Sequence, residues 1–348
     1  MARPEPAEPP AAHPAAPAGR RRRRFLFAVL GLLLAAGVAA AFLLSLPRTP
    51  DAGSMQSPVP SAAVTPSPTP RPEPPPTTLN ILLIGSDSRV NQRGAAAAGK
   101  VSDQRADTLV FLHLPANRQQ VYGISLMRDL WVSIPGHGEA KINASLELGG
   151  IPLATRTVES LLGQRINHTV MVDFQTFAAL TDAVGGVDVM VKLPFTSTID
   201  AGVAFSAGVN RLNGARALDF VRERKAFVDG DYQRVRNQQT FLKAVLAKVV
   251  RQSVADRAAA RKLAATVLPR VTVVPALTLD ALARLTFSFR KTPAGGVFFT
   301  LPTAGDGTSD DGQSIVVQDP AKTAELAAAL RANKLGSYVA GHKLQNGN

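Results

Sequence analysis

The chain contains no cysteine in its 348 residues, which excludes disulfide bonds, thiol catalysis and cysteine-ligated zinc. The sequence also lacks the G-x-x-x-x-G-K-[ST] pattern of a phosphate-binding loop. Ser86 and Ser88 follow an apolar run, but no G-x-S-x-G nucleophile elbow surrounds them. The five histidines have no spacing typical of a metal site or a catalytic triad. The carboxylates and arginines are therefore the more informative candidates for chemistry.

An uncharged apolar run over residues 25–46 predicts one transmembrane helix. Its 22 residues would reach roughly 33 Å, against a hydrocarbon core of about 30 Å. The five arginines Arg20–Arg24 stand directly before it, and the positive-inside rule keeps such a run in the cytoplasm. We therefore expect a basic cytoplasmic tail over 1–24, a single-pass anchor in the cell membrane, and the remainder of the chain outside the cell.

A cleaved signal peptide is the alternative interpretation, because Ala39–Ala41 resembles a cleavage site. The apolar run continues through Phe42–Leu44 without a polar region before the cut, which favours the uncleaved anchor. The formal net charge is +13, and part of it belongs to the cytoplasmic tail, where it meets anionic lipid. The basic segment 220–239 would lie outside the cell, which disfavours a nucleic-acid partner and a transcriptional regulator.

The composition divides the rest of the chain into a linker, a globular domain and a tail. Residues 47–77 contain 11 prolines and cannot form a packed core, so we expect an extended spacer. Over 78–334, short apolar runs alternate with segments of helical spacing. This alternation predicts an α/β fold, a layered α-β-α domain around a central mixed sheet. The tail 335–348 is expected to be flexible.

The expected strands and helices follow from apolar runs and their periodicity. Strands are expected over 79–85, 107–114, 120–126, 168–174, 187–191 and 295–302, and helices over 174–186, 238–254 and 321–333. The helix at 238–254 carries an apolar stripe from Phe241 to Val250. That stripe fits either the ordinary core or the lining of an apolar groove.

Two short polar motifs adjoin the first two expected strands. GSDSR places Asp87 and Arg89 just after one strand, and RADT places Arg105 and Asp107 at the start of the next. If these strands are antiparallel neighbours, both motifs lie at the same edge of the sheet. Two carboxylates there would suit Mg²⁺ with open positions for phosphate oxygens, and arginines suit a bidentate grip on phosphate. The alternative is two turn aspartates with surface salt bridges.

More cations follow at later strand ends and turns. Arg128 precedes Asp129 after the strand at 120–126, and Lys141 lies in the turn segment KINAS. The segment FVRERKAFVDGDYQRVRNQQ at 220–239 then supplies Arg222, Arg224, Arg234 and Gln238. This recurrence favours an anion site where loops converge at one edge of a sheet, although alternating charge also fits a solvated helix face.

Five stretches of this sequence, in order over roughly 79–250, resemble the LytR-CpsA-Psr family of cell-envelope proteins. They are NILLIGSDSR, RADTLVFLHL, SLMRDLWVSIPGHGEAKINAS, VDFQTFAALTDAVGGVDV and LNGARALDFVRERKAFVDGDYQRVRNQQTFL. The expected tail, anchor, linker and outer domain agree with that family's architecture.

The resemblance implies a phosphotransferase that joins a glycopolymer, carried on polyprenyl pyrophosphate, to peptidoglycan through a phosphodiester. It implies a groove for the polyprenyl chain, Mg²⁺ as cofactor, and membrane lipid, peptidoglycan and the lipid-linked glycopolymer as partners. Asp87 and Asp107 become the metal ligands. The predicted catalytic residues that grip the pyrophosphate are Arg128, Arg222, Arg224 and Arg234, with Asp231, and the predicted pyrophosphate-binding residues are Arg89, Arg105, Lys141 and Gln238. Asp231 would position or deprotonate the acceptor hydroxyl.

The chain departs from the family pattern at several positions. Leu126-Met127 replaces a usual Ile-Pro, and Leu130 replaces a common Thr, which should only alter loop shape. Asn237 stands where an Arg often precedes the Gln, and Arg236 is a candidate to compensate. Two other functions stay open: a pyrophosphatase that releases polyprenyl phosphate, and a non-catalytic binder of anionic envelope polymers.

Overall fold

The computed structural model describes residues 77–87, 93–101, 104–252, 256–289, 292 and 296–344. The expected cytoplasmic tail, the transmembrane helix, nearly all of the linker, and Arg89 lie outside these residues. Within the described ranges, no helix combines the length and apolar character needed to cross a membrane.

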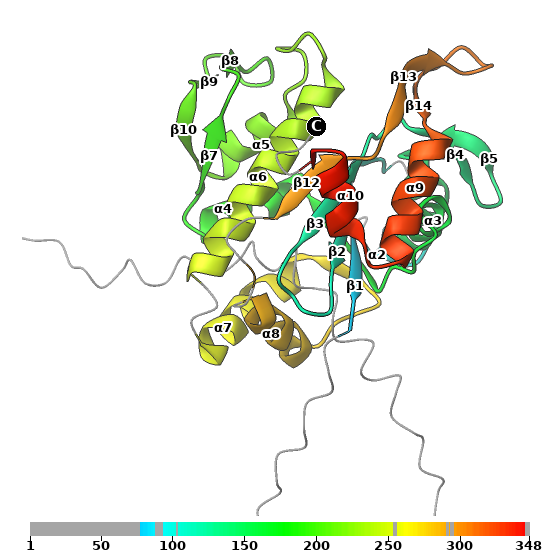
Figure 1. Ribbon diagram of the computed structural model, residues 1–348. Helices are drawn as coiled ribbons and strands as arrows, with labels where there is room; N and C mark the ends of the chain where they lie inside the picture. Colours follow the sequence, from blue (N-terminus) through cyan, green and yellow to red (C-terminus); the bar gives the residue numbers. More distant parts are fainter. Residues whose placement is uncertain are drawn as a thin grey trace, which may run out of the picture.

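A six-stranded mixed sheet forms the centre of the domain (Figure 1). Its spatial order is β11-β6-β1-β2-β3-β12, with β1 antiparallel to β2 and parallel to β6. β2 is antiparallel to β3, and β3 is parallel to β12. β1, β3, β6 and β12 therefore end at one edge, here named the C-terminal edge, and β2 begins there. The strands are β1 (Leu79–Ser86), β2 (Ala106–Leu114), β3 (Tyr122–Leu126), β6 (His168–Asp173), β11 (Thr272–Val274) and β12 (Val297–Thr300).

Helices cover both faces of this sheet because both faces of its central strands are apolar. In β1, Leu79, Ile81 and Leu83 belong to one buried cluster, whereas Leu82 and Ile84 belong to the other. Strands buried on both sides are typical of the three-layer arrangement that the sequence predicts. The first cluster includes residues of α4 (Phe174–Ala183), α5 (Gly214–Arg222), α6 (Asp231–Gln252), α7 (Arg257–Val267) and α8 (Leu279–Ser288). The second includes residues of α2 (Arg93–Ala97), α3 (Ala144–Leu162), α9 (Pro320–Arg331) and α10 (Leu335–Gly341).

Two-stranded ribbons surround the central sheet in the described part of the chain. They pair β4 (Trp131–Ile134) with β5 (Gly138–Lys141), β7 (Val187–Val191) with β10 (Gly208–Leu212), β8 (Phe195–Thr196) with β9 (Ala204–Phe205), and β13 (Thr303–Thr308) with β14 (Ser314–Gln318). The sequence predicts only β7 among these strands. A short 3₁₀ turn, Leu268–Arg270, follows α7.

Helix α6 begins at Asp231, well before the expected start at residue 238. Gly230 has a positive φ of 48° and ends the preceding loop. The Asp231 carboxylate then lies in the first turn, where the helix dipole favours negative charge. The segment 220–239 is therefore the end of α5, a loop and the first turns of α6, not one solvated helix face.

Residues 335–341 form helix α10, so the expectation of a flexible tail is wrong for this segment. Leu335, Tyr338 and Val339 are buried in the second cluster. The Tyr338 ring centre lies 6.3 Å from that of Phe299 in β12. A single short helix offers too few turns for its apolar spacing to be recognised in the sequence, whereas burial against the sheet stabilises it.

Candidate functional site

The pairing of β1 with β2 brings Asp87 and Asp107 to the C-terminal edge, as the antiparallel arrangement predicts. Gly85 pairs with Thr108, but the register shifts at the next residue, so Asp107 has no pairing partner in β1. Such an irregularity re-aims the side chain of the extra residue. A Cβ atom on Gly85 would lie 3.0 Å from the Cβ of Thr108, which explains why glycine stands at this close approach.

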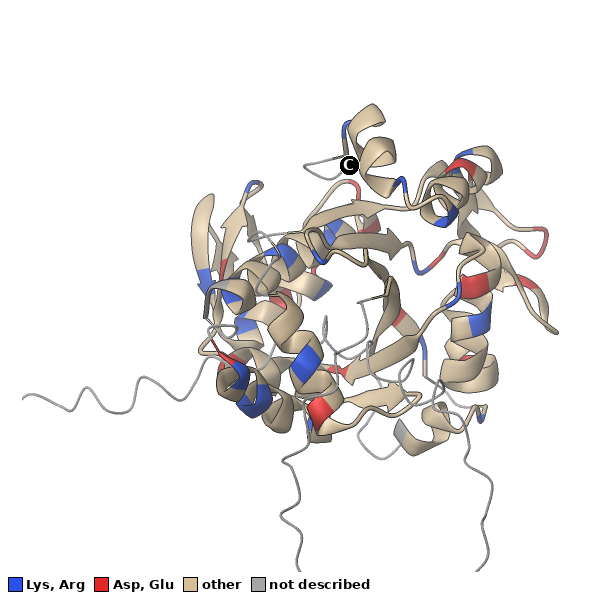
Figure 2. Cartoon of the chain, turned by 60° about the horizontal axis from the view of Figure 1, so that its bottom comes forward, with Lys and Arg blue, Asp and Glu red and all other residues tan. Residues whose placement is uncertain are grey.

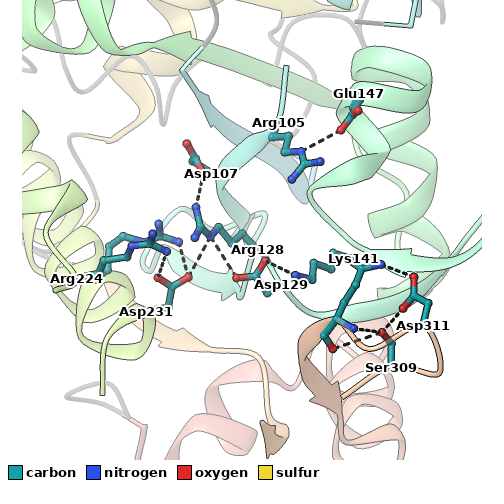
Figure 3. Close-up of polar contacts among 12 residues, drawn as sticks. Arg105, Asp107, Arg128, Asp129, Lys141, Glu147, Arg224, Asp231, Ser309 and Asp311 are labelled. Carbon is teal, nitrogen blue, oxygen red and sulfur yellow. Dashed lines mark hydrogen bonds and ion pairs between the residues drawn. The ribbon is translucent and has the colours of Figure 1, made fainter. Parts of the chain in front are cut away.

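Asp231 is the centre of an ion-pair network at this edge (Figure 3). Its Oδ2 atom lies 2.9 Å from Nη2 of Arg234 and 3.1 Å from Nε of Arg128. Its Oδ1 atom lies 3.8 Å from Nη1 of Arg224. Arg128 also donates a hydrogen bond of 2.8 Å from Nη1 to Oδ1 of Asp107. Four segments thus converge on one point: the beginning of β2, the loop after β3, the loop after α5 and the first turn of α6.

The two least exposed arginines of this network differ in how their charge is stabilised. Burial alone would lower the pKa of Arg128, but the carboxylates of Asp231 and Asp107 hold that pKa above its ordinary value. The Arg234 side chain is only 7% exposed, and burial lowers its pKa despite Asp231. Among all described residues, none accepts a hydrogen bond from the buried Nε of Arg234. A buried guanidinium with an unused N–H favours one further anionic ligand.

A pocket of about 330 Å³ adjoins the network and has two kinds of lining. Its charged part is lined by Asp107, Arg128, Arg222, Glu223, Arg224, Lys225 and Arg234, together with Gln238. Its apolar part includes Val110, Val172, Phe177, Leu218, Phe241 and Leu242. The apolar stripe of α6 belongs to the core, and its first part, Phe241 and Leu242, also lines the pocket. Such a lining fits a ligand with an anionic head and an apolar chain.

The end of α5 brings two predicted arginines to the pocket. Arg222 is the last residue of α5, and its guanidinium carbon lies 4.4 Å from the centre of the Phe174 ring. That contact is a cation–π interaction, which fixes the direction of the arginine. Gln238 donates a 3.2 Å hydrogen bond to the carbonyl of Val221 and so joins α6 to the end of α5.

Glu223, which is not among the predicted site residues, holds the loop that carries Arg224. It is fully buried and accepts hydrogen bonds from the backbone and hydroxyl of Thr198 at 2.6 and 2.9 Å. The backbone N–H groups of Arg224 and Ala226 donate to the same carboxylate at 2.9 and 3.2 Å. Burial would raise the pKa of Glu223, but these hydrogen bonds outweigh it and lower that pKa. In the sequence, this residue resembles any acid in a run of alternating charge.

Arg105 and Lys141 lie near the network but do not line the pocket (Figure 3). Arg105 places its Nε 3.0 Å from Oε2 of Glu147 on α3, and its side chain is 62% exposed. Lys141 places its Nζ 3.7 Å from Oδ1 of Asp129. These contacts do not draw either residue into the pocket, so their roles in pyrophosphate binding stay predictions.

Arg236 and Asn237 are not among the residues that line the pocket. Arg236 forms an ion pair with Asp229 and donates to Gln233 at 2.9 Å. Asn237 is buried and donates to the carbonyl of Phe220 at 3.2 Å. Neither residue lines the pocket, so compensation by Arg236 for a missing arginine at position 237 stays a prediction without structural support.

Asp87 and Asp107 offer hard oxygen donors at the ends of adjacent strands. The described residues contain no group of three or more His, Asp or Glu side chains able to hold a metal ion by themselves. Mg²⁺ in proteins is commonly bound by one or two carboxylates, with waters and substrate phosphates as the other ligands. The donor set therefore fits a Mg²⁺ ion that binds together with a phosphate ligand.

Residues 55–331 match the family model of the LytR_cpsA_psr family. The chain is 36% identical over 174 residues to a probable cell wall biosynthesis protein, LcpB of Corynebacterium glutamicum, covering 48% of this chain and 41% of that protein. It is 34% identical over 171 residues to TagU of Bacillus mycoides, a polyisoprenyl-teichoic acid–peptidoglycan teichoic acid transferase, covering 49% of this chain and 52% of that protein. The chain spans about half the length of these curated relatives.

Solved structures share the mixed α/β fold. The crystal structure of B. subtilis TagV superposes with a TM-score of 0.61 at 24% identity, covering 74% of this chain and 97% of that chain. A structure of TagT bound to LIIa-WTA has a TM-score of 0.57 at 26% identity, covering 75% of this chain and 91% of that chain. The central mixed sheet and its helical layers are thus a fold that has been observed experimentally in similar proteins.

Proposed function

Because the chain belongs to the LytR_cpsA_psr family, we propose that it is a membrane-anchored phosphotransferase of the cell envelope. It transfers a glycopolymer from a polyprenyl pyrophosphate carrier to peptidoglycan and joins the two through a phosphodiester. The observation that carries this proposal is the pocket with an arginine-lined part and an apolar part. Such a lining suits a pyrophosphate head with an isoprenoid chain. The activity for which the TagU relative is named supports transfer over binding alone.

The proposed reaction is an in-line displacement at phosphorus. A hydroxyl oxygen of peptidoglycan attacks the phosphorus that carries the glycopolymer and forms a new P–O bond. The bond from that phosphorus to the bridging oxygen breaks, and polyprenyl phosphate leaves with the oxygen. The hydroxyl proton passes to solvent or to the leaving phosphate. Catalysis of this kind consists mainly of positioning and of neutralising phosphate oxygens.

The arginines would provide that neutralisation from two depths. Arg222 and Arg224 are exposed and would receive the donor, while Arg128 and Arg234 are less exposed. The unused Nε of Arg234 would donate to a phosphate oxygen. Asp231 lies between the arginines, and both its oxygens face guanidinium groups. We therefore assign Asp231 the positioning of the arginines rather than proton removal.

Asp87 and Asp107 are proposed to hold Mg²⁺ together with phosphate oxygens of the donor. When bound, the ion would neutralise charge on the pyrophosphate. Arg128 is bonded to Asp107 through Oδ1 and would keep that carboxylate at the mouth of the pocket. The membrane anchor proposed at 25–46 would hold enzyme and donor on one membrane, which raises their effective concentration.

Two other activities would use the same pocket. A pyrophosphatase would take water as acceptor and release polyprenyl phosphate. A non-catalytic binder of anionic polymer would meet repulsion from Asp87 and Asp107 unless a metal ion intervened. The pyrophosphatase and the transferase would use the same pocket and would differ in the acceptor, which is water for the pyrophosphatase and a peptidoglycan hydroxyl for the transferase.

One incubation separates the three activities. The full chain is mixed with a lipid-linked glycopolymer, peptidoglycan fragments and Mg²⁺, and the products are separated by mass. A transferase yields linked polymer and polyprenyl phosphate in equal amounts. Polyprenyl phosphate without linked polymer would indicate the pyrophosphatase, and an intact donor would indicate the binder; either result overturns the proposal.

A further inference from the structure

Large exposed apolar side chains are concentrated in one part of the sequence. Seven such residues occur in the described chain, and five of them fall between residues 190 and 228. We name these five the rim patch: Met190, Leu193, Ile199, Val209 and Val228, with Val228 fully exposed. Single exposed apolar residues are normal, but a contiguous group marks an interaction surface.

Aromatic packing joins two segments that carry rim-patch residues, the β8–β9 ribbon and the loop after α5. The Phe195 ring of β8 lies 4.6 Å from Phe205 in β9 and 4.7 Å from Phe227 in the loop after α5. These contacts fasten the β8–β9 ribbon to the loop that contains Val228, and Leu193 is two residues before Phe195. Ile199 and Lys225, one from each of these segments, both line the pocket. Of the rim patch, Ile199 lines this pocket, whereas Met190 and Leu193 line a separate hollow with Lys192, Arg236 and Lys243.

The outer face of the β7–β10 ribbon extends this patch. Met190 pairs with Val209 across the two strands, and they are 55% and 69% exposed. An outward face of a solvated ribbon would normally carry polar residues at such positions. An apolar cross-strand pair is therefore largely exposed on the outer face of this ribbon.

Cations surround the rim patch. Lys192 follows Met190 on the outer face of the ribbon, and Lys225 lies three residues before Val228. In the described ranges, neither lysine takes part in an ion pair. Figure 2 shows that Lys, Arg, Asp and Glu residues are interspersed over the helices of the domain. Asp188 and Asp229, near Met190 and Val228, are paired with Arg211 and Arg236, while Asp200 beside Ile199 is exposed. The surface therefore combines exposed apolar side chains with a small excess of positive charge.

We propose that the rim patch docks on the surface of an anionic lipid bilayer and opens the pocket directly to it. Apolar side chains bury in the interface while lysines attract anionic headgroups. A polyprenyl chain would then pass from the bilayer to the apolar lining at Leu218 and Leu242 without crossing water. This docking rests on the proposed function, because it explains how a lipid-linked donor reaches the pocket.

The covalent geometry of the chain permits this orientation. β1 begins at the edge opposite the C-terminal edge, so the chain enters the domain far from the pocket. The 31 residues of 47–77 can reach at most about 100 Å when fully extended. The distance from the start of β1 to the C-terminal edge is the length of this strand, about 26 Å for eight residues. The linker can therefore span more than this distance. A domain attached through this segment can therefore turn its pocket towards the membrane.

The absence of cysteine makes a direct test possible. Val228→Cys and Val101→Cys would each give one labelling site in the full chain, and both positions are exposed. Each variant, labelled with a fluorophore, is reconstituted into vesicles that contain anionic lipid and a nitroxide-labelled quencher lipid. Val101 is the matched control, since it is exposed but outside the rim patch. We expect several-fold stronger quenching at position 228 than at 101, and weaker quenching at high salt.

Equal quenching at the two positions would overturn the docking proposal. Energy transfer between labelled copies, without lipid quenching, would overturn it in favour of a contact with a second copy of this chain. Because quenching requires no donor and no turnover, a failure here leaves the proposed transferase activity to be judged separately.

A kinetic comparison provides a second test. The variant Met190→Ser/Leu193→Ser/Val209→Ser should be several-fold slower with a donor embedded in vesicles, yet unchanged with a water-soluble short-chain donor. None of these side chains lines the pocket, and Val317→Ser is the control for an exposed valine elsewhere. Equal loss with both donors, or no loss with either, contradicts docking.

Discussion

Arg128 Nε lies 3.1 Å from Oδ2 of Asp231, although the two residues are 103 positions apart in the sequence. The contact joins the loop after β3 to the first turn of α6. Asp231 Oδ2 also lies 2.9 Å from Arg234, so two partly buried guanidinium groups share one carboxylate oxygen. The arginines would repel one another without it, and the geometry of the pocket therefore depends on Asp231.

Replacing Asp231 with Asn should reduce both stability and turnover. The partly buried charges of Arg128 and Arg234 would lose their common partner, at a cost of about 1–3 kcal/mol in the free energy of unfolding. Asp229→Asn is the matched control, because Asp229 pairs with Arg236 at an exposed position and should cost no more than about 0.5 kcal/mol. Equal denaturation midpoints for the two variants would show that Asp231 does not hold the network.

Replacing Arg222, Arg224 or Arg234 with Ala should weaken binding of a short-chain polyprenyl pyrophosphate. Each lost charge-assisted contact should cost roughly 1.5–3 kcal/mol, or about ten- to hundredfold in affinity. Arg222→Lys should also bind poorly, since an ammonium lacks the planar fork that stacks on Phe174. Arg236→Ala, which alters a residue outside the pocket lining, should bind normally. Unchanged affinity in the variants of Arg222, Arg224 and Arg234 would show that these arginines do not bind the pyrophosphate.

Replacing Asp87 or Asp107 with Ala should greatly reduce Mg²⁺-dependent transfer while the domain remains folded. The readouts are turnover across a Mg²⁺ titration, binding of Mg²⁺ in the presence of the donor, and a melting curve. Asp107→Ala should also free Arg128 from its 2.8 Å hydrogen bond and lower stability slightly. Full Mg²⁺-dependent turnover in both variants would place the metal elsewhere.

Glu223→Gln should destabilise the protein most at neutral pH. An amide cannot accept all the hydrogen bonds that the carboxylate receives, which should cost about 1–3 kcal/mol. The folded-state pKa of Glu223 lies below its ordinary value of 4.5. Its stabilisation is therefore complete above pH 4.5 and is lost as the pH falls through the folded-state pKa. Denaturation curves across this range should converge for variant and wild type; the exposed Glu139→Gln serves as control, and a difference constant with pH contradicts this role.

Protease added to intact protoplasts should digest the chain after residue 47 and spare the basic tail. The reason is the positive charge of Arg20–Arg24, which favours a cytoplasmic N-terminus. If the protease instead cleaves the basic tail and leaves the outer domain intact, the orientation is the opposite one. The domain would then lie on the cytoplasmic side, away from peptidoglycan, which contradicts the proposed function.

The strands of the central sheet other than β11 were predictable because each is a compact apolar run. β1 and β2 end within one residue of their predicted limits, and their antiparallel pairing places Asp87 and Asp107 at one edge. The start of α6 was not predictable from hydrophobic periodicity. Its first two turns are mostly polar and are stabilised by contacts with distant residues, such as that of Asp231 with Arg128.

The assignment of side chains within α6 follows from helix geometry once its start is known. Arg234, Gln238 and Phe241 are spaced i, i+4 and i+7 and share the face that lines the pocket. Arg236 is two residues after Arg234 and lies on another face, paired with Asp229. The sequence alone does not show which arginines line the pocket, because all of them carry the same charge. For Arg105 the answer depends on a tertiary contact, since Glu147 holds it outside the pocket.

β1, the strand by which the chain enters the domain, is bonded to neighbours on both sides. It pairs with β2 from Leu79 to Ser86 and with β6 from Ile81 to Ser86. A pull on the chain ahead of Leu79 acts along the strand, so the hydrogen bonds on both sides must shear together rather than open one at a time. Helix α10, near the other end of the described chain, is held by side-chain packing. The domain should therefore withstand more force through its entering strand than through its last helix.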